Sequence, residues 1–213
     1  MVMYHLMIGQ PEWPRPESPG FTAILVVDVQ RDFCLGGALA VPDGDRVVGV
    51  LNQILRAAHA RRLTLYATRD WHPHNSRHFL AGGRTWPAHC IAGSAGARFH
   101  PDLDLPEGTL IVSKGIEADS DGYSAFEGRL ENGTSLSDDL RQRGITHLIT
   151  GGLATDYCIR HSVLDAMQKG WHVTVVTDAI AAVELTPGDG ERALAKMRAG
   201  GAEFRRSTEL DLV

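Results

Sequence analysis

The sequence has little cysteine, no excess of basic charge and no long apolar runs. Only three cysteines occur among 213 residues, Cys34, Cys90 and Cys158. A small, odd number argues against a disulfide framework and suits a reducing compartment, so we expect a cytoplasmic protein. The formal net charge of −5 does not favour nucleic-acid binding. No apolar run approaches the roughly 20 residues of a membrane-spanning helix, so no membrane partner is expected.

Residues 1–20 differ in composition from the rest of the chain, because four of the ten prolines lie there. The segment has no basic start and no cleavage pattern, so it does not resemble a signal peptide. We interpret it as an extended arm. Residues 21–213 fit a single domain with a sizeable core. A small-molecule substrate is the expected partner, and homo-oligomerisation stays open.

Beyond the arm, strand-like and helix-like patterns alternate along the chain. Asp43 is a plausible N-cap for the first helix. Strands are expected at 23–28, 63–68, 109–113, 147–150, 171–177 and 203–205, and helices at 43–61, 136–143, 156–169 and 190–200. This alternation predicts an α/β fold, an open, mostly parallel sheet with helices on both faces.

Residues that can do chemistry follow several of the expected strands. The first strand ends on Asp28, the second leads to Asp70, the third to Lys114, and the fourth opens a segment that reaches Cys158. Because parallel strands deliver their carboxyl ends to one edge of an open sheet, these four residues are expected to meet there.

Cys158 follows a strand and falls in the first turn of the next expected helix, where Thr155 or Asp156 could act as the cap. Free backbone N–H groups and the helix dipole favour an anion at that point, so we expect a lowered thiol pKa and a place for an oxyanion. Asp28 could exchange a proton with this thiol, and Lys114 could stabilise the negative charge. The alternatives are a core cysteine, a turn aspartate and a surface lysine.

Five of the ten histidines lie between positions 70 and 101, in a stretch without clear periodicity. Asp70 and His72 are two residues apart and point the same way on an extended segment, so both can bind one ion. His89 would complete a set of one carboxylate and two imidazoles, and His78 could be a fourth ligand. Zinc, iron and manganese suit this set equally. His74 and His100 are interpreted as surface residues or as partners of the ligands.

Five motifs carry a resemblance that runs from about Thr22 to the C-terminus. They are Asp28-Val29-Gln30-Arg31-Asp32-Phe33, Asp70-Trp71-His72, Thr85-Trp86-Pro87-Ala88-His89-Cys90, Lys114-Gly115 with Tyr123-Ser124-Ala125-Phe126, and the segment from Gly151 to Cys158. Together and in this order, they resemble the nicotinamidases, or pyrazinamidases, of the isochorismatase-like cysteine hydrolase family. The resemblance implies a three-layer α/β/α fold.

The resemblance also implies roles for particular residues. It makes Asp28, Lys114 and Cys158 a catalytic triad, and it places one divalent metal ion on Asp70, His72 and His89, with His78 as an extra ligand in some members. It assigns Phe33, Trp86 and Tyr123 to a pyridine pocket. It further implies a cis peptide between Leu153 and Ala154, with the N–H groups of Ala154 and Cys158 directed at the oxyanion.

The implied reaction is the deamidation of nicotinamide to nicotinate and ammonia through a cysteine thioester, a step of NAD salvage. An amidase acting on another small amide or an N-carbamoyl compound is the alternative within the family. Relatives that cleave isochorismate fit less well, because their vinyl-ether chemistry uses no thiol. A non-catalytic binding module would have had no need to keep Asp28, Lys114, Cys158 and the metal residues together.

Overall fold

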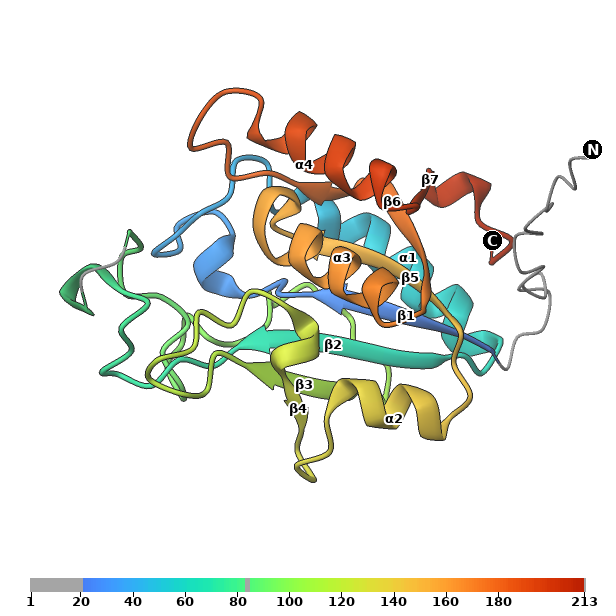
Figure 1. Cartoon of the computed structure of the whole chain (residues 1–213), viewed down its shortest axis with the longest axis horizontal. Coiled ribbons are helices and arrows are strands. Elements are labelled where there is room, and N and C mark those ends of the chain that lie inside the picture. Colours follow the sequence, from blue (N-terminus) through green and yellow to red (C-terminus); the bar gives the residue numbers. More distant parts are fainter. Residues whose placement is uncertain (1–20, 83–84, 213) are drawn as a thin grey trace, which may run out of the picture.

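The computed structural model describes residues 21–82 and 85–212, and its centre is one seven-stranded sheet with the order β4-β3-β2-β1-β5-β6-β7 (Figure 1). The expected arm, residues 1–20, lies outside the described residues. The strands are β1 (Thr22–Val27), β2 (Thr64–Asp70), β3 (Leu110–Lys114), β4 (Arg129–Leu130), β5 (His147–Leu153), β6 (His172–Ala181) and β7 (Glu203–Arg205). Only β4 runs antiparallel to its neighbour. The predicted, mostly parallel sheet is confirmed.

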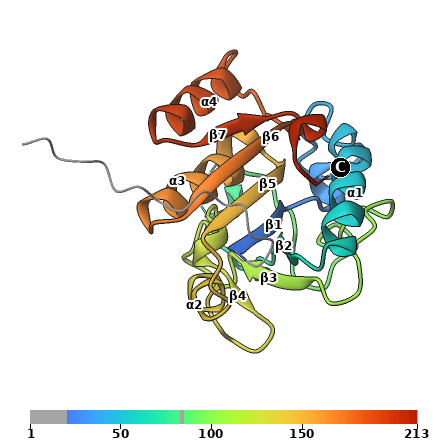
Figure 2. The ribbon, with the colours of Figure 1, turned by 90° about the vertical axis from the view of Figure 1, so that its right-hand side faces the viewer.

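Helices cover both faces of this sheet, as Figure 2 shows with α1 on one side and α2, α3 and α4 on the other. The helices are α1 (Arg46–Ala60), α2 (Leu136–Gln142), α3 (Arg160–Gln168) and α4 (Asp189–Ala199). They form three layers with a separate apolar core on each face of the sheet. Within the described part of the chain, no helix has the length and apolar character needed to cross a membrane.

The apolar run at the start of the domain forms the central strand β1, and all six residues of this strand are buried. Ile24 and Val26 belong to the core beneath α1, whereas Ala23, Leu25 and Val27 belong to the opposite core. Successive side chains of a strand point to opposite faces, so a strand covered on both sides must be apolar at every position.

Two local expectations are wrong, and one short element was missed. Asp43 does not cap α1: its φ is +56°, and the helix begins at Arg46. A single helix over 156–169 is replaced by a π-helical turn, Thr155–Ile159, followed by α3. The short strand β4 was not expected, because two residues are too few to carry a period-2 pattern.

The strand expected at 147–150 is longer in the structure, where it extends to Leu153 as β5. Gly152 permits this extension. Its φ is +127°, and a Cβ there would lie 2.1 Å from the carbonyl oxygen of Val27. The glycine therefore lets the end of β5 run directly against the end of β1, one residue before Asp28.

The long segment between β2 and β3 is held by isolated bridges, two within the segment and one to the residues that follow β1. His72 pairs with Ile91, Phe79 pairs with Trp86, and Gln30 pairs with Phe99. The Gln30 side chain, fully buried, also donates to the carbonyl oxygens of Asp70 (2.8 Å) and Ala97 (2.9 Å) and accepts from the Asp70 N–H (2.7 Å). The segment is thereby fixed over the carboxyl ends of the strands.

Candidate active site

The strand ends bring the expected residues together. Asp28 directly follows β1, and Asp70 and Lys114 are the last residues of β2 and β3, where they pair in register. Ala154 follows β5, and Cys158 lies in the π-helical turn after it. One oxygen from Asp28, one from Asp70 and the sulfur of Cys158 all lie within 4.8 Å of one another.

Lys114 lies at the centre of this group and is 0% exposed, so the surface-lysine alternative is wrong. Its Nζ donates to Asp70 Oδ1 (2.5 Å), to the Gly122 carbonyl (2.6 Å) and to Cys158 Sγ (3.4 Å). These contacts use all three N–H bonds of the ammonium group. Burial acts to lower the Lys114 pKa, but the Asp28 and Asp70 carboxylates raise it well above its usual value. Lys114 therefore stays protonated.

Asp28 has one satisfied oxygen and one that faces the reacting groups. Thr68 Oγ1 donates to Oδ1 at 2.6 Å. Oδ2 lies 2.7 Å from Lys114 Nζ as an ion pair, but it receives no aligned hydrogen bond. Burial raises the Asp28 pKa to about 6, although the Lys114 charge opposes this. Asp28 can therefore both accept and release a proton near neutral pH.

The lowered pKa expected for the Cys158 thiol is wrong. The residue is 6% exposed, and burial raises its pKa well above the usual value even though the Lys114 charge opposes this. Desolvation of a thiolate outweighs the favourable end of the helix. The sulfur therefore keeps its proton until a neighbouring group takes it, and Asp28 is in place to do so.

The expected capping role of Thr155 or Asp156 is also wrong, since neither side chain caps the turn. The buried Asp156 carboxylate instead accepts from the N–H groups of Val183 and Glu184, both at 2.9 Å. Asp156 thereby fixes the segment after β6 beside the pocket. Two adjacent backbone donors almost thirty residues away leave no local sequence signal.

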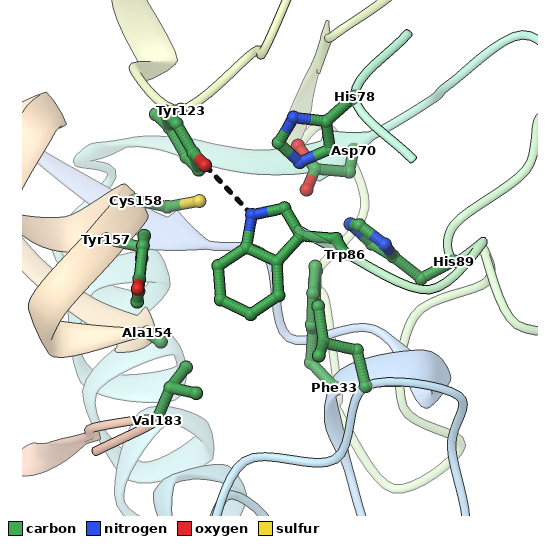
Figure 3. Close-up of a pocket in the computed structure, with 11 residues that line it drawn as sticks. Phe33, Asp70, His78, Trp86, His89, Tyr123, Ala154, Tyr157, Cys158 and Val183 are labelled. Carbon is green, nitrogen blue, oxygen red and sulfur yellow. Dashed lines mark hydrogen bonds between the residues drawn. The ribbon is translucent and has the colours of Figure 1, made fainter. Parts of the chain in front are cut away.

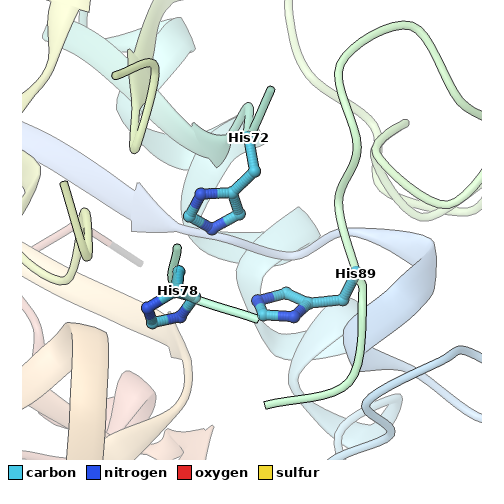
Figure 4. A group of neighbouring side chains, drawn as sticks. All are labelled: His72, His78 and His89. Carbon is cyan, nitrogen blue, oxygen red and sulfur yellow. The ribbon is translucent and has the colours of Figure 1, made fainter. Parts of the chain in front are cut away.

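Three buried histidines form a second cluster, with one ring nitrogen from each within 4.8 Å of the others (Figure 4). His72 Nδ1 contacts the Gly115 carbonyl (3.1 Å), His89 Nδ1 contacts the Pro87 carbonyl (2.8 Å), and His78 Nδ1 contacts Asp121 Oδ1 (3.1 Å). Carbonyl and carboxylate oxygens only accept, so each Nδ1 carries the hydrogen and each Nε2 keeps its lone pair.

These lone pairs fit a metal ion. His72 Nε2 is buried without a hydrogen-bond partner, and Asp70 Oδ2 lies 3.7 Å from it. Burial lowers the pKa of His89 to about 4 and also lowers the pKa of His78. Neutral imidazoles with Nδ1 held by an oxygen are the form that binds divalent metals.

A second group, Cys34, Asp45 and His100, is equally close but does not suit a metal. His100 Nδ1 accepts from the Asp102 N–H (3.2 Å), so its Nε2 carries the hydrogen and donates to Asp45 (3.2 Å). Burial, with the Asp45 charge, raises the Cys34 pKa to about 12. The nitrogen and the sulfur are thus both protonated.

A pocket opens onto both clusters, and Figure 3 shows Cys158 on one side and His78 and His89 on the other. The expected pocket residues Phe33, Trp86 and Tyr123 all line it. Trp86 Nε1 donates to the Tyr123 hydroxyl at 2.9 Å. Leu39, Tyr157 and Val183 also line the pocket and were not expected. Of these, only Tyr157 had a sequence signal, since it adjoins Cys158.

The peptide between Leu153 and Ala154 is cis, as the resemblance implied. The isochorismatase domain family matches residues 22–209. The chain belongs to the isochorismatase family. The resemblance stated from the motifs is therefore confirmed.

Named members of the isochorismatase family match most of the chain. The nicotinamidase of Escherichia coli (strain K12) is 41% identical over 197 residues, which cover 84% of this chain and 92% of that protein. The nicotinamidase/pyrazinamidase of Mycobacterium tuberculosis (strain ATCC 25618 / H37Rv) is 39% identical over 185 residues, covering 85% and 97%. The solved pyrazinamidase of Pyrococcus horikoshii in complex with zinc has a TM-score of 0.81 at 40% identity, covering 87% and 99%.

Proposed function

We propose that the chain is a metal-dependent amidohydrolase that converts nicotinamide and water to nicotinate and ammonia, so that the ring can return to NAD synthesis. The observation that carries the proposal is the contact of Lys114 with Asp28, Asp70 and Cys158 at the wall of an aromatic pocket. The nicotinamidases among the relatives support the substrate.

The first half of the reaction makes a thioester. Asp28 takes the proton of Cys158 as the sulfur bonds to the carboxamide carbon, and the carbonyl electrons move to the oxygen. Protonated Asp28 then gives its proton to the nitrogen, the C–N bond breaks, and ammonia leaves. Lys114 keeps its charge throughout and holds Asp28 and the sulfur in position.

The second half returns the enzyme to its starting state. Asp28 takes a proton from water as the water oxygen attacks the thioester carbon. The C–S bond then breaks, and Asp28 returns the proton to the departing sulfur of Cys158. The backbone N–H groups of Ala154 and Cys158 are the proposed donors to the oxyanion in both halves, and loss of one such donor typically costs about 3 kcal/mol in the barrier.

The proposed metal ligands are Asp70, His72, His78 and His89, which suit zinc, iron or manganese. When bound, a divalent ion supplies a fixed point that orients the pyridine nitrogen, directly or through water. Phe33, Trp86 and Tyr123 are proposed to pack around the ring.

Ammonia release from nicotinamide tests the proposal. Cys158→Ala should lower turnover by about 10⁴-fold or more, the scale seen when a catalytic nucleophile is removed. Cys34→Ala is the matched control, because Cys34 is also a buried thiol but does not line the pocket. An N-carbamoyl amine is assayed in parallel, and faster hydrolysis of this compound than of nicotinamide would favour the alternative amidase. Substantial deamidation by Cys158→Ala would rule out the thioester, and no deamidation by the wild type would reject the substrate.

A further inference from the structure

The three clustered histidines differ in what holds them. His72 and His89 give Nδ1–H to backbone carbonyls, which are fixed by the fold and cannot change charge. His78 gives Nδ1–H to a carboxylate, Asp121 Oδ1 at 3.1 Å. This is the only one of the three contacts made with an ionisable side chain.

A carboxylate at this place has two physical effects on His78. It fixes the ring so that Nε2 points toward the other two histidines, and its negative charge makes the imidazole a stronger donor to a cation. The ring of His78 is also stacked on His72, with centroids 4.9 Å apart and planes 18° from parallel.

Asp121 also lies on a segment that contacts Lys114 and the pocket. Its chain neighbour Gly122 accepts from Lys114 Nζ, and Tyr123 accepts from Trp86. The backbone here is therefore held by Lys114 on one side and by the pocket on the other, which fixes the carboxylate relative to His78.

We propose that Asp121 is the positioning residue that makes His78 a ligand of the metal ion. The inference rests on the metal site of the proposed function and deepens it, because it assigns the fourth ligand to a carboxylate–histidine pair. Without Asp121 the ion would be held by Asp70, His72 and His89 alone.

The test measures zinc affinity of the metal-free protein by competition with a chromophoric chelator, without any assay of turnover. Asp121→Ala should weaken zinc binding by about 10- to 100-fold, as loss of a ligand's hydrogen-bond partner typically does. Asp121→Asn should recover part of this affinity, because an amide oxygen still accepts from Nδ1–H. Asp119→Ala is the matched control: it removes the same charge from the same segment, but Asp119 pairs with Arg77 at 2.9 Å on the surface.

A second comparison shows whether the effect passes through His78. In a His78→Ala background, the further change to Asp121→Ala should leave zinc affinity unaltered, and the cobalt absorption spectra of the two proteins should coincide. Equal losses in the Asp121 and Asp119 variants, or a full loss that persists without His78, would overturn the inference. Tight zinc binding by wild type and Asp121→Ala alike would overturn it while leaving the metal site intact. Absence of zinc binding by the wild type would reject the metal site itself.

Discussion

Asp28 and Lys114 lie at the ends of the parallel strands β1 and β3, which flank β2, whereas His78 and His89 lie on the long segment between β2 and β3. The first group, here called the thiol half (Asp28, Lys114 and Cys158), is held by side-chain contacts with a buried ammonium at the centre. The second group, the histidine half (His72, His78 and His89), is held mainly by hydrogen bonds to backbone carbonyls and one carboxylate. Asp70 joins them, with Oδ1 on Lys114 and Oδ2 toward His72.

This difference assigns different physical tasks to the two halves. In the proposed reaction the thiol half transfers a proton, and burial raises the pKa values of Asp28 and Cys158. In the proposed metal site the histidine half supplies lone pairs at fixed positions, and each imidazole is held by a hydrogen bond at Nδ1. We therefore expect substitutions in one half to change chemistry without changing metal binding, and the reverse for the other half.

Among the changes that keep the thiol, the largest effect on turnover should follow Asp28→Asn. An amide cannot take the thiol proton, so kcat/KM should fall by about 10²- to 10⁴-fold. Zinc affinity should stay at the wild-type value, because Asp28 is not among the proposed ligands. Asp43→Asn, a change at an exposed aspartate that contacts Arg46, serves as the control. Loss of zinc binding in Asp28→Asn would contradict the assignment of proton transfer and metal binding to different halves.

The histidine half should also respond to Gly115→Ala. A Cβ at Gly115 would lie 2.4 Å from His72 Cε1, and φ there is +64°. The ring must move, so zinc affinity should fall by about 10- to 100-fold while alkylation of Cys158 proceeds at the wild-type rate. Gly133→Ala is matched in backbone strain, with φ +84°, but its Cβ meets nothing within 4 Å. If both variants bind zinc equally well, His72 is not held as described.

The thiol half should show its own pH dependence. Asp28 must be ionised to take the thiol proton, and burial raises its pKa to about 6 against the opposing charge of Lys114. Below about pH 6, the ionised fraction falls tenfold per pH unit, so kcat/KM should fall with it and level off above about pH 7. Asp70, Cys90, Lys114 and Cys158 are the other ionisable groups that interact with Asp28. Metal content is measured at each pH, and a flat profile in fully loaded enzyme would contradict this role.

The smallest effect on activity is expected from a substitution in the pocket, which is lined by residues of both halves. Tyr123→Phe removes the acceptor of Trp86 Nε1–H, and an unpaired buried donor costs about 1–3 kcal/mol. KM for nicotinamide should rise by roughly three- to tenfold with little change in kcat. Tyr66→Phe is the control, because it also removes a buried hydrogen bond of a tyrosine hydroxyl, to Asp139 at 2.6 Å, but neither residue lines the pocket. Equal KM shifts in both variants would indicate a general loss of stability.

The sequence was most informative where one rule acts over the whole fold. Strands that are apolar at almost every position, such as β1, predict a parallel sheet, and the carboxyl-edge rule then predicts that Asp28, Asp70 and Lys114 meet. The five motifs added the pocket aromatics and the cis peptide at Leu153–Ala154, and that peptide is present. The catalytic and metal roles of these residues stay predictions.

The sequence was least informative where contacts between distant segments decide the outcome. The Cys158 pKa depends on burial, which a position in the first turn of a helix does not reveal. Asp156 looked like a cap, but its partners lie after β6. Asp121 carries no signal of its own, since only the folded chain places it against His78.

A crystal structure with pyridine-3-carboxaldehyde tests the central claim most directly. An aldehyde has no leaving group, so the adduct formed by a nucleophilic thiol stays in place. The account predicts a covalent bond from Cys158 Sγ to the aldehyde carbon, with the ring beside Trp86 and its nitrogen toward the three histidines. An unbonded aldehyde, or a bond to any other residue, would contradict it.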